Sequence, residues 1–184
     1  YNIFMKDKLL SCIEDKQTNY IPIWFMRQAG RYLPEFRKIR KKNPNFIDLC
    51  LNIKLVKDIT LQPLNRFDLD AAIIFSDILM IPYGLNQKVE FKKGFGPILG
   101  DINFDNIINK NPTDFVQKLL PIYEGIKKVK KKLNEKSLIG FVGAPWTLLV
   151  YMLNKESPKN NFDFNIINKD KKLINKLLKK IEEI

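Results

Sequence analysis

The sequence predicts an α/β fold built around a mainly parallel sheet. Three apolar runs, at residues 21–26, 69–75 and 138–143, have the composition of buried strands, and a helical pattern follows each of them. The second run is apolar at nearly every position, as expected for a strand with both faces buried in a parallel sheet. Repeated strand–helix units favour parallel pairing, and we expect one domain over residues 1–184.

Helical patterns account for most of the remaining chain. Pro34 suits the first turn of a helix, and Pro63 is expected to kink or shorten a later one. Pro121 is expected to open the helix before the third strand, and Thr147 is expected to cap the helix after it. The other expected elements are helices over residues 3–15, 34–42, 46–51 and 53–67, a loop or β-hairpin over 82–100, a surface loop over 154–168, and a final helix from about residue 168.

Composition is that of a globular protein with an excess of basic residues. The chain has 184 residues, of which 45% are hydrophobic and 28% charged, and its formal net charge is +12. The lysines are interleaved with apolar residues at helical spacing, which indicates solvated helix faces, so we expect no nucleic-acid partner. A positive field would still attract a polyanionic substrate.

Other composition features exclude several classes of site. Histidine is absent, which excludes Ser-His-Asp machinery and histidine-based metal sites within this chain. Cys12 and Cys50 lie in apolar helical contexts and are expected to be core residues. No apolar run approaches the roughly 20 residues of a membrane span, and we expect a cytoplasmic protein. Because the chain starts at Tyr1 and its final helix has no cap, we expect both termini to be trimmed.

The first apolar run leads into an unusual polar stretch. Arg27 and Arg31 flank a short segment with Gln28 and Gly30, and glycine can adopt backbone angles that most residues avoid. Two guanidiniums on a tight loop after a strand suit a ligand with several carboxylates, because guanidinium stays charged and binds carboxylate in a two-pronged geometry. The alternative is that these arginines are surface charges or form structural salt bridges.

The other two strands also end in polar or aromatic residues. Asp77 follows the second strand, where burial of a carboxylate is costly unless it is paired or hydrogen-bonded. It could accept N–H groups of a ligand, cap a helix or pair with an arginine. Trp146 and Tyr151 follow the third strand and could be site residues or core aromatics. Functional residues of parallel barrels gather at these strand ends.

Three segments resemble motifs of the uroporphyrinogen decarboxylase family, in the same order. They are Met26-Arg-Gln-Ala-Gly-Arg31 with the following Tyr32-Leu-Pro-Glu-Phe36, then Phe75-Ser-Asp-Ile-Leu79, and finally Gly140-Phe-Val-Gly-Ala-Pro-Trp-Thr-Leu-Leu-Val-Tyr-Met152. The resemblance implies a (β/α)8 TIM barrel. A complete barrel needs about 250 residues, so this chain would cover roughly the first half.

The resemblance also implies a reaction and its site. The family removes the four acetate carboxyls of uroporphyrinogen III to give coproporphyrinogen III in porphyrin and heme biosynthesis, with no metal or organic cofactor, as a homodimer. Asp77 would contact the pyrrole N–H groups and stabilise the protonated pyrrole, and Arg27 and Arg31 would hold carboxylates, one of them assisting proton delivery. The implied substrate-binding residues are Arg27, Gln28, Ala29, Gly30, Arg31, Asp77 and Tyr151, with Arg40 and Trp146 as further candidates.

The sequence departs from the family pattern after Met152. Many members continue with an acidic residue and a glycine-rich turn, whereas this chain reads Leu153-Asn-Lys-Glu-Ser-Pro158. The family's later Ser and His contacts have no counterpart before Ile184. Two alternatives therefore stay open: a corrinoid- or zinc-dependent methyltransferase on the same barrel, and a fragment without catalytic activity.

Overall fold

The structure is a computed structural model that describes residues 8–15, 19–92, 94–158 and 164–184. Its contacts divide the chain into two compact units. The parallel-strand unit comprises residues 1–44, 48–76 and 121–141, and the hairpin unit comprises residues 45–47, 77–120 and 142–184. In the described part of the chain, no helix is both long and apolar enough to cross a membrane.

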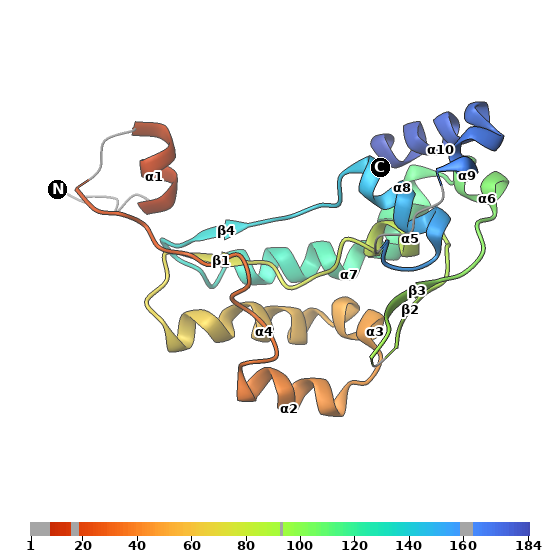
Figure 1. Cartoon of the computed structure of the whole chain (residues 1–184). Helices are drawn as coiled ribbons and strands as arrows, with labels where there is room; N and C mark the ends of the chain where they lie inside the picture. The colour runs from red at the N-terminus through yellow and green to blue at the C-terminus, as the bar shows by residue number, and fades with distance from the viewer. Residues whose placement is uncertain (1–7, 16–18, 93, 159–163) are drawn as a thin grey trace. The chain divides into compact units, whose positions relative to one another are not determined.

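The parallel-strand unit is built on two short strands that lie side by side (Figure 1). β1 (Ala71–Ile73) and β4 (Ser137–Ile139) pair in parallel, with Ala71 opposite Ser137 and Ile73 opposite Ile139. This pairing confirms the second and third predicted strands, although both are shorter than their apolar runs. The helices that lie wholly or mainly in this unit are α1 (Lys8–Asp15), α2 (Pro34–Lys42), α3 (Phe46–Leu51), α4 (Ile53–Arg66) and the second half of α7 (Pro112–Lys130).

The core of this unit lies between the strands and two helices. Val56 of α4 and Val129 of α7 are fully buried against Ala72 and Ile74 of the β1 region. The helices cover one face of the strand pair, as a βαβ unit requires. Gly125 of α7 lies against Val56, where an added Cβ would come within 3.1 Å of a methyl group.

The first predicted strand is wrong. Residues 21–25 form no strand, and their side chains are largely exposed, with Ile21 at 87% and Phe25 at 61%. The Ile23 N–H donates to the Asp70 carboxylate, and the Ile23 carbonyl accepts from the Asp70 backbone N–H. On the edge of β1 that faces away from β4, side chains bond to the backbone in place of a strand. Gln28 donates to the Ala71 carbonyl, and just beyond β1 Thr60 accepts from the Phe75 N–H.

The proline signals predict helix boundaries with mixed success. α2 starts at Pro34 and ends at Lys42 as expected, and Pro63 lies inside α4, near its end. The expected start at Pro121 is wrong, because α7 begins at Pro112 and continues through Pro121. A proline in a helix interior removes one backbone hydrogen bond without always ending the helix.

The hairpin unit contains an antiparallel strand pair and short helices. β2 (Val89–Lys92) and β3 (Gly96–Leu99) form the hairpin, which confirms one of the two structures expected for residues 82–100. Gly94 and Gly96 both have positive φ values, which glycine adopts without strain. The helices of this unit are α5 (Met80–Gly84), α6 (Phe104–Ile108), the first half of α7, α8 (Pro145–Asn154), α9 (Asn165–Lys169) and α10 (Lys171–Glu183).

Helix α8 is central to the hairpin unit because it contacts both α5 and α10. The expected cap at Thr147 is wrong: α8 begins at Pro145, and its N-cap is Ala144, with no capping side chain. α10 begins where expected, and the Asp170 carboxylate caps it by accepting from the Leu173 N–H at 2.9 Å. α9 was expected to be loop, and residues 159–163 of that predicted loop lie outside the described residues.

Candidate functional site

The segment Arg27–Arg31, here called the arginine loop, is held to β1 by one buried amide. Gln28 is only 3% exposed, and its Nε2 donates to the Ala71 carbonyl at 3.0 Å. Its Oε1 accepts from the Phe25 N–H at 2.9 Å. The Tyr32 hydroxyl donates to the Gln28 carbonyl, so side chain and backbone of this residue are both fixed. Gln28 therefore determines where the loop leaves the strand.

The two arginines of the loop project from this anchor. Arg27 and Arg31 are exposed, and neither has a hydrogen-bond or ion-pair partner among the residues that the structure describes. The alternative of structural salt bridges therefore finds no support in the described residues. Gly30 does not have a positive φ, so the loop does not use the backbone freedom that glycine offers. Its carbonyl accepts from the Leu33 N–H at 3.0 Å, which turns the chain into α2.

Asp77 lies at the start of the hairpin unit and is half-buried. Its Oδ1 accepts from the Leu79 N–H at 2.9 Å, and its backbone carbonyl accepts from the Met80 N–H. Burial raises the pKa of the Asp77 carboxyl, and the bond from Leu79 offsets part of that rise. No ion pair of Asp77 exists within the described residues. A half-buried carboxylate with one N–H donor and no ion pair favours further N–H donors or a cation, which would offset the cost of its burial.

The third motif packs tightly onto its own helix. A Cβ on Gly143 would come within 2.6 Å of Leu148 and within 3.1 Å of Ile78, so this glycine allows the loop to approach α8. Trp146 is 48% exposed in the first turn of α8. Tyr151 is half-buried, and its hydroxyl lies 3.3 Å from the Ser157 Oγ. That hydroxyl can also contact a polar ligand group, because a phenol both donates and accepts.

The hairpin holds the C-terminal end of α8. Gln87 is 2% exposed, and its Nε2 donates to the carbonyls of Gly100, at 2.9 Å, and Met152, at 3.1 Å. The Leu99 N–H donates to the Lys155 carbonyl at 2.6 Å, directly after the helix. These bonds fix the turn that carries Tyr151.

Arg40 has a local structural role. Its guanidinium donates to the carbonyls of Asn43 and Pro44, which follow α2. Such bonds satisfy carbonyls at a helix C-terminus. Nothing in these contacts assigns Arg40 to a ligand.

The predicted site residues fall into two groups, one in each unit. The arginine loop belongs to the parallel-strand unit, and Asp77, Trp146 and Tyr151 belong to the hairpin unit. In the described ranges, no cluster of three His, Cys, Asp or Glu side chains could hold a metal ion. Sequence reasoning missed Gln87 and Ser157, because nothing in their local sequence shows that they contact α8 or Tyr151.

Comparisons with known proteins cover almost the whole chain. The family model "Uroporphyrinogen decarboxylase (URO-D)" matches residues 5–184. Curated proteins named uroporphyrinogen decarboxylase are similar to this chain, at 49% identity in Rickettsia felis, 46% in Chelativorans sp. and 41% in Brucella anthropi. These matches cover 75%, 79% and 94% of this chain, and 40%, 43% and 52% of the respective relatives. The chain thus spans about half the length of the curated relatives that it matches, and corresponds to their N-terminal half.

A solved structure supports the fold. A methyltransferase from Methanosarcina mazei superposes with a TM-score of 0.70 over 97% of this chain and 52% of its own. At 14% sequence identity this likeness concerns the fold alone, and it supports a partial α/β fold of the TIM-barrel type. The family model over residues 5–184 decides the family: this chain belongs to the uroporphyrinogen decarboxylase family.

Proposed function

We propose that this chain takes part in the decarboxylation of uroporphyrinogen III to coproporphyrinogen III, a step of porphyrin and heme biosynthesis. In each of four rounds an acetate side chain loses CO₂ and its carbon gains a proton. A pyrrole protonated on a ring carbon can accept the electron pair of the breaking C–C bond, so the substrate supplies its own electron sink. The protein then has to bind a polycarboxylate and stabilise a transient cation.

The arginine loop supplies the first requirement. One observation carries the proposal: Arg27 and Arg31 are both exposed without partners in the described chain, while the loop between them is fixed by the buried Gln28. Because the buried Gln28 holds the loop backbone, binding of two carboxylates would have to order only the two arginine side chains and not the loop that carries them. The backbone at Ala29 and Gly30, which carries little side-chain bulk, would lie against the ligand.

Asp77 supplies the second requirement. Burial makes its ionised form costly, and a protonated pyrrole or several pyrrole N–H groups would offset that cost. The carboxylate in return stabilises positive charge that develops on the pyrrole, which is electrostatic catalysis by a fixed group. The Leu79 N–H holds Oδ1 in place and leaves Oδ2 for the ligand.

The remaining candidates have orienting roles in this proposal. Tyr151, fixed through its helix by Gln87, would orient a carboxylate or Asp77. Trp146 would provide apolar contact with the macrocycle, and Arg40 would reach a peripheral carboxylate only by giving up its bonds to backbone carbonyls. Gln28 is assigned to the binding site as the anchor of the arginine loop.

Finer statements on architecture and assembly belong to the same proposal. The two parallel strands with their helices are part of the first half of a single (β/α)8 barrel domain, and the active protein is a cytoplasmic homodimer. The methyltransferase alternative is not preferred, because the likeness to such an enzyme is 14% in sequence and concerns the fold alone.

An anaerobic assay of the 184-residue chain with uroporphyrinogen III tests the proposal. Release of CO₂ is expected, and Asp77→Asn is expected to lower kcat by about 100-fold or more, the scale for loss of one electrostatic contact in a site. Asp105→Asn, at an exposed position of α6, is the matched control and should leave kcat unchanged. Unchanged turnover of Asp77→Asn would remove Asp77 from the mechanism, and no turnover of the unmodified chain would contradict activity of this polypeptide.

A further inference from the structure

Asp70, the residue before β1, connects three segments of the parallel-strand unit. Its Oδ2 accepts from the Ile23 N–H at 2.8 Å, and its own backbone N–H donates to the Ile23 carbonyl at 2.8 Å. Its backbone carbonyl accepts from the Ser137 N–H at the start of β4, and its Oδ1 lies 3.4 Å from the Lys8 Nζ of α1. The Asp70 side chain is 15% exposed, so its carboxylate needs these partners to offset the cost of burial.

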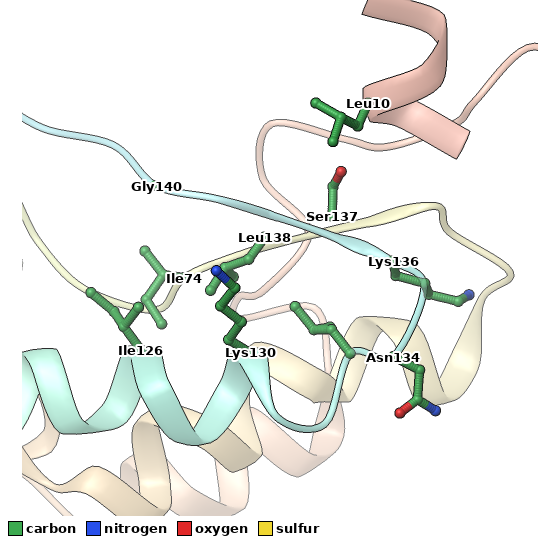
Figure 2. Close-up of a pocket in the computed structure, with 10 residues that line it drawn as sticks. Leu10, Ile74, Ile126, Lys130, Asn134, Lys136, Ser137, Leu138 and Gly140 are labelled. Atoms are coloured by element: carbon green, nitrogen blue, oxygen red, sulfur yellow. The ribbon is translucent and has the colours of Figure 1, made fainter. Parts of the chain in front are cut away.

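Helix α1 lies against β4, which brings Lys8 to the Asp70 carboxylate. Figure 2 shows the Leu10 side chain of α1 facing Ser137 of β4, on the wall of a cavity of about 520 Å³. The Lys8 side chain is 54% exposed, and an exposed ion pair contributes little because water screens it. We therefore attribute the main structural role of the carboxylate to its bond with Ile23.

The segment that contains Ile23 depends on hydrogen bonds rather than on packing. Residues 21–26 form no strand, and their side chains are largely exposed. Hydrogen bonds hold the segment at two points: Ile23 is bonded to Asp70, and Gln28 is bonded to Ala71. Because these two partners are adjacent in the chain, the segment between Ile23 and Gln28 forms a loop that is closed at its base. Weakening the anchor at Ile23 would leave this loop firmly held at one end only.

The two arginines stand in different relations to these anchors. Arg27 lies between the anchors, so both of them determine its position. Arg31 lies beyond Gln28 and two residues before Leu33, which is 1% exposed and leads into α2. The Leu33 N–H donates to the Gly30 carbonyl at 3.0 Å. Packing of Leu33 therefore holds Arg31 independently of the anchor at the other end of the loop.

We propose that Asp70 is a positioning residue for Arg27. Its carboxylate holds Ile23 and so fixes the segment from which the Arg27 guanidinium reaches a carboxylate of the ligand. Without that bond the segment would have to be ordered when the ligand binds, and the ordering would cost affinity. Arg31 keeps its position in either case. This inference rests on the proposed function, in which both arginines bind carboxylates of uroporphyrinogen.

Double-mutant cycles test the inference, with binding measured by anaerobic calorimetric titration with uroporphyrinogen III. In the otherwise unmodified chain, Arg27→Gln and Arg31→Gln should each weaken binding by about tenfold or more, the effect of losing one charge-assisted hydrogen bond. In the Asp70→Ala background, Arg27→Gln should weaken binding by less than about threefold, whereas the effect of Arg31→Gln should stay within about twofold of its value in the unmodified chain. General loss of stability would change both effects alike, so coupling to one arginine alone identifies positioning.

The outcomes separate this inference from the proposed function. No binding of uroporphyrinogen III by the unmodified chain contradicts the proposed function. Binding in which Asp70→Ala leaves the Arg27→Gln effect unchanged, or reduces both arginine effects equally, overturns the positioning role while the proposed function stands.

Further variants identify the hydrogen bond that matters. Ile23→Pro removes the donor of the same bond, so it should reduce the Arg27→Gln effect as Asp70→Ala does, and an unchanged effect contradicts the inference. Asp70→Asn keeps an oxygen that can accept from Ile23, so it should restore most of the effect. Lys8→Gln is the matched control, because it removes the ion pair and keeps the bond to Ile23. Loss of the Arg27→Gln effect in Lys8→Gln would assign the role to the ion pair and overturn that of the Ile23 bond.

Amide hydrogen exchange of the free proteins supplies a readout that needs no ligand. Asp70→Ala should speed exchange of the Ile23 amide by about tenfold, the effect of one lost hydrogen bond. The Ile74 N–H, which donates to the Ile139 carbonyl, should keep its protection and so show that the β1–β4 pair is intact. Unchanged exchange at Ile23 would overturn the claim that the carboxylate holds this residue.

Discussion

Replacement of Gln28 by alanine tests how the arginine loop is built. The side chain is 3% exposed and makes two hydrogen bonds, one to the Ala71 carbonyl and one from the Phe25 N–H. Each bond contributes about 1 kcal/mol, and the fully buried Ala71 would keep an unpaired carbonyl at a further cost of about 1–3 kcal/mol. Alanine avoids the entropy cost of ordering the glutamine side chain on folding, which offsets about 1.5 kcal/mol of this loss. Together these contributions predict that Gln28→Ala lowers the free energy of unfolding by about 1.5–3.5 kcal/mol.

Urea denaturation of the 184-residue chain, followed by circular dichroism, measures this loss. Gln117→Ala, at an exposed position of α7, is the matched control and should change the free energy of unfolding by less than about 0.5 kcal/mol. The stability that Gln28→Glu loses relative to wild type should be larger at pH 7 than under acid conditions, because only the protonated carboxyl can donate to the Ala71 carbonyl. A loss below about 0.5 kcal/mol in Gln28→Ala would refute the claim that this amide anchors the loop.

Three further predictions concern the hairpin unit. Burial raises the pKa of Asp77, so the contribution of this carboxyl to stability falls as the pH rises above 3.8 and through the raised pKa. Urea titrations should therefore show Asp77→Asn gaining stability relative to wild type over that range. A difference in unfolding free energy between the two proteins that does not change with pH would contradict this. Gly143→Ala should cost about 1–3 kcal/mol through contact with Leu148, whereas Gly140→Ala, with no atom within 4 Å of the added Cβ, should be nearly neutral; equal thermal midpoints would be inconsistent with the packing. Gln87→Ala should increase proteolysis after α8, because the Met152 carbonyl loses its donor.

Local signals in the sequence predict those elements that depend on local chemistry. The helix over residues 34–42 has Pro34 at its start, and its extent is as predicted. The second and third strands are confirmed because each is an apolar run that packs against helices of its unit, although β1 is largely buried and β4 only half-buried. The family and the order of its motifs are also evident in the sequence.

The errors arise where contacts distant in sequence decide the outcome. The apolar composition of residues 21–26 predicts a buried strand, yet the Ala71 carbonyl on the far edge of β1 bonds to the Gln28 side chain, 43 residues away. Likewise, the Gln87 bond to the Met152 carbonyl spans 65 residues, and no local pattern indicates it. Pro121 lies within α7 because the rest of that helix supplies enough pairing to tolerate one missing bond.

The central claim is that two guanidiniums of the arginine loop bind carboxylates of uroporphyrinogen. Anaerobic calorimetric titration of the 184-residue chain with uroporphyrinogen III tests it most directly. The double variant Arg27→Gln/Arg31→Gln should bind at least about 100-fold more weakly than wild type, since each charge-assisted hydrogen bond contributes about 1.5–3 kcal/mol and two are lost. Arg37→Gln, at an exposed position of α2, should bind like wild type. Equal affinity of the double variant and the Arg37 control would contradict the account.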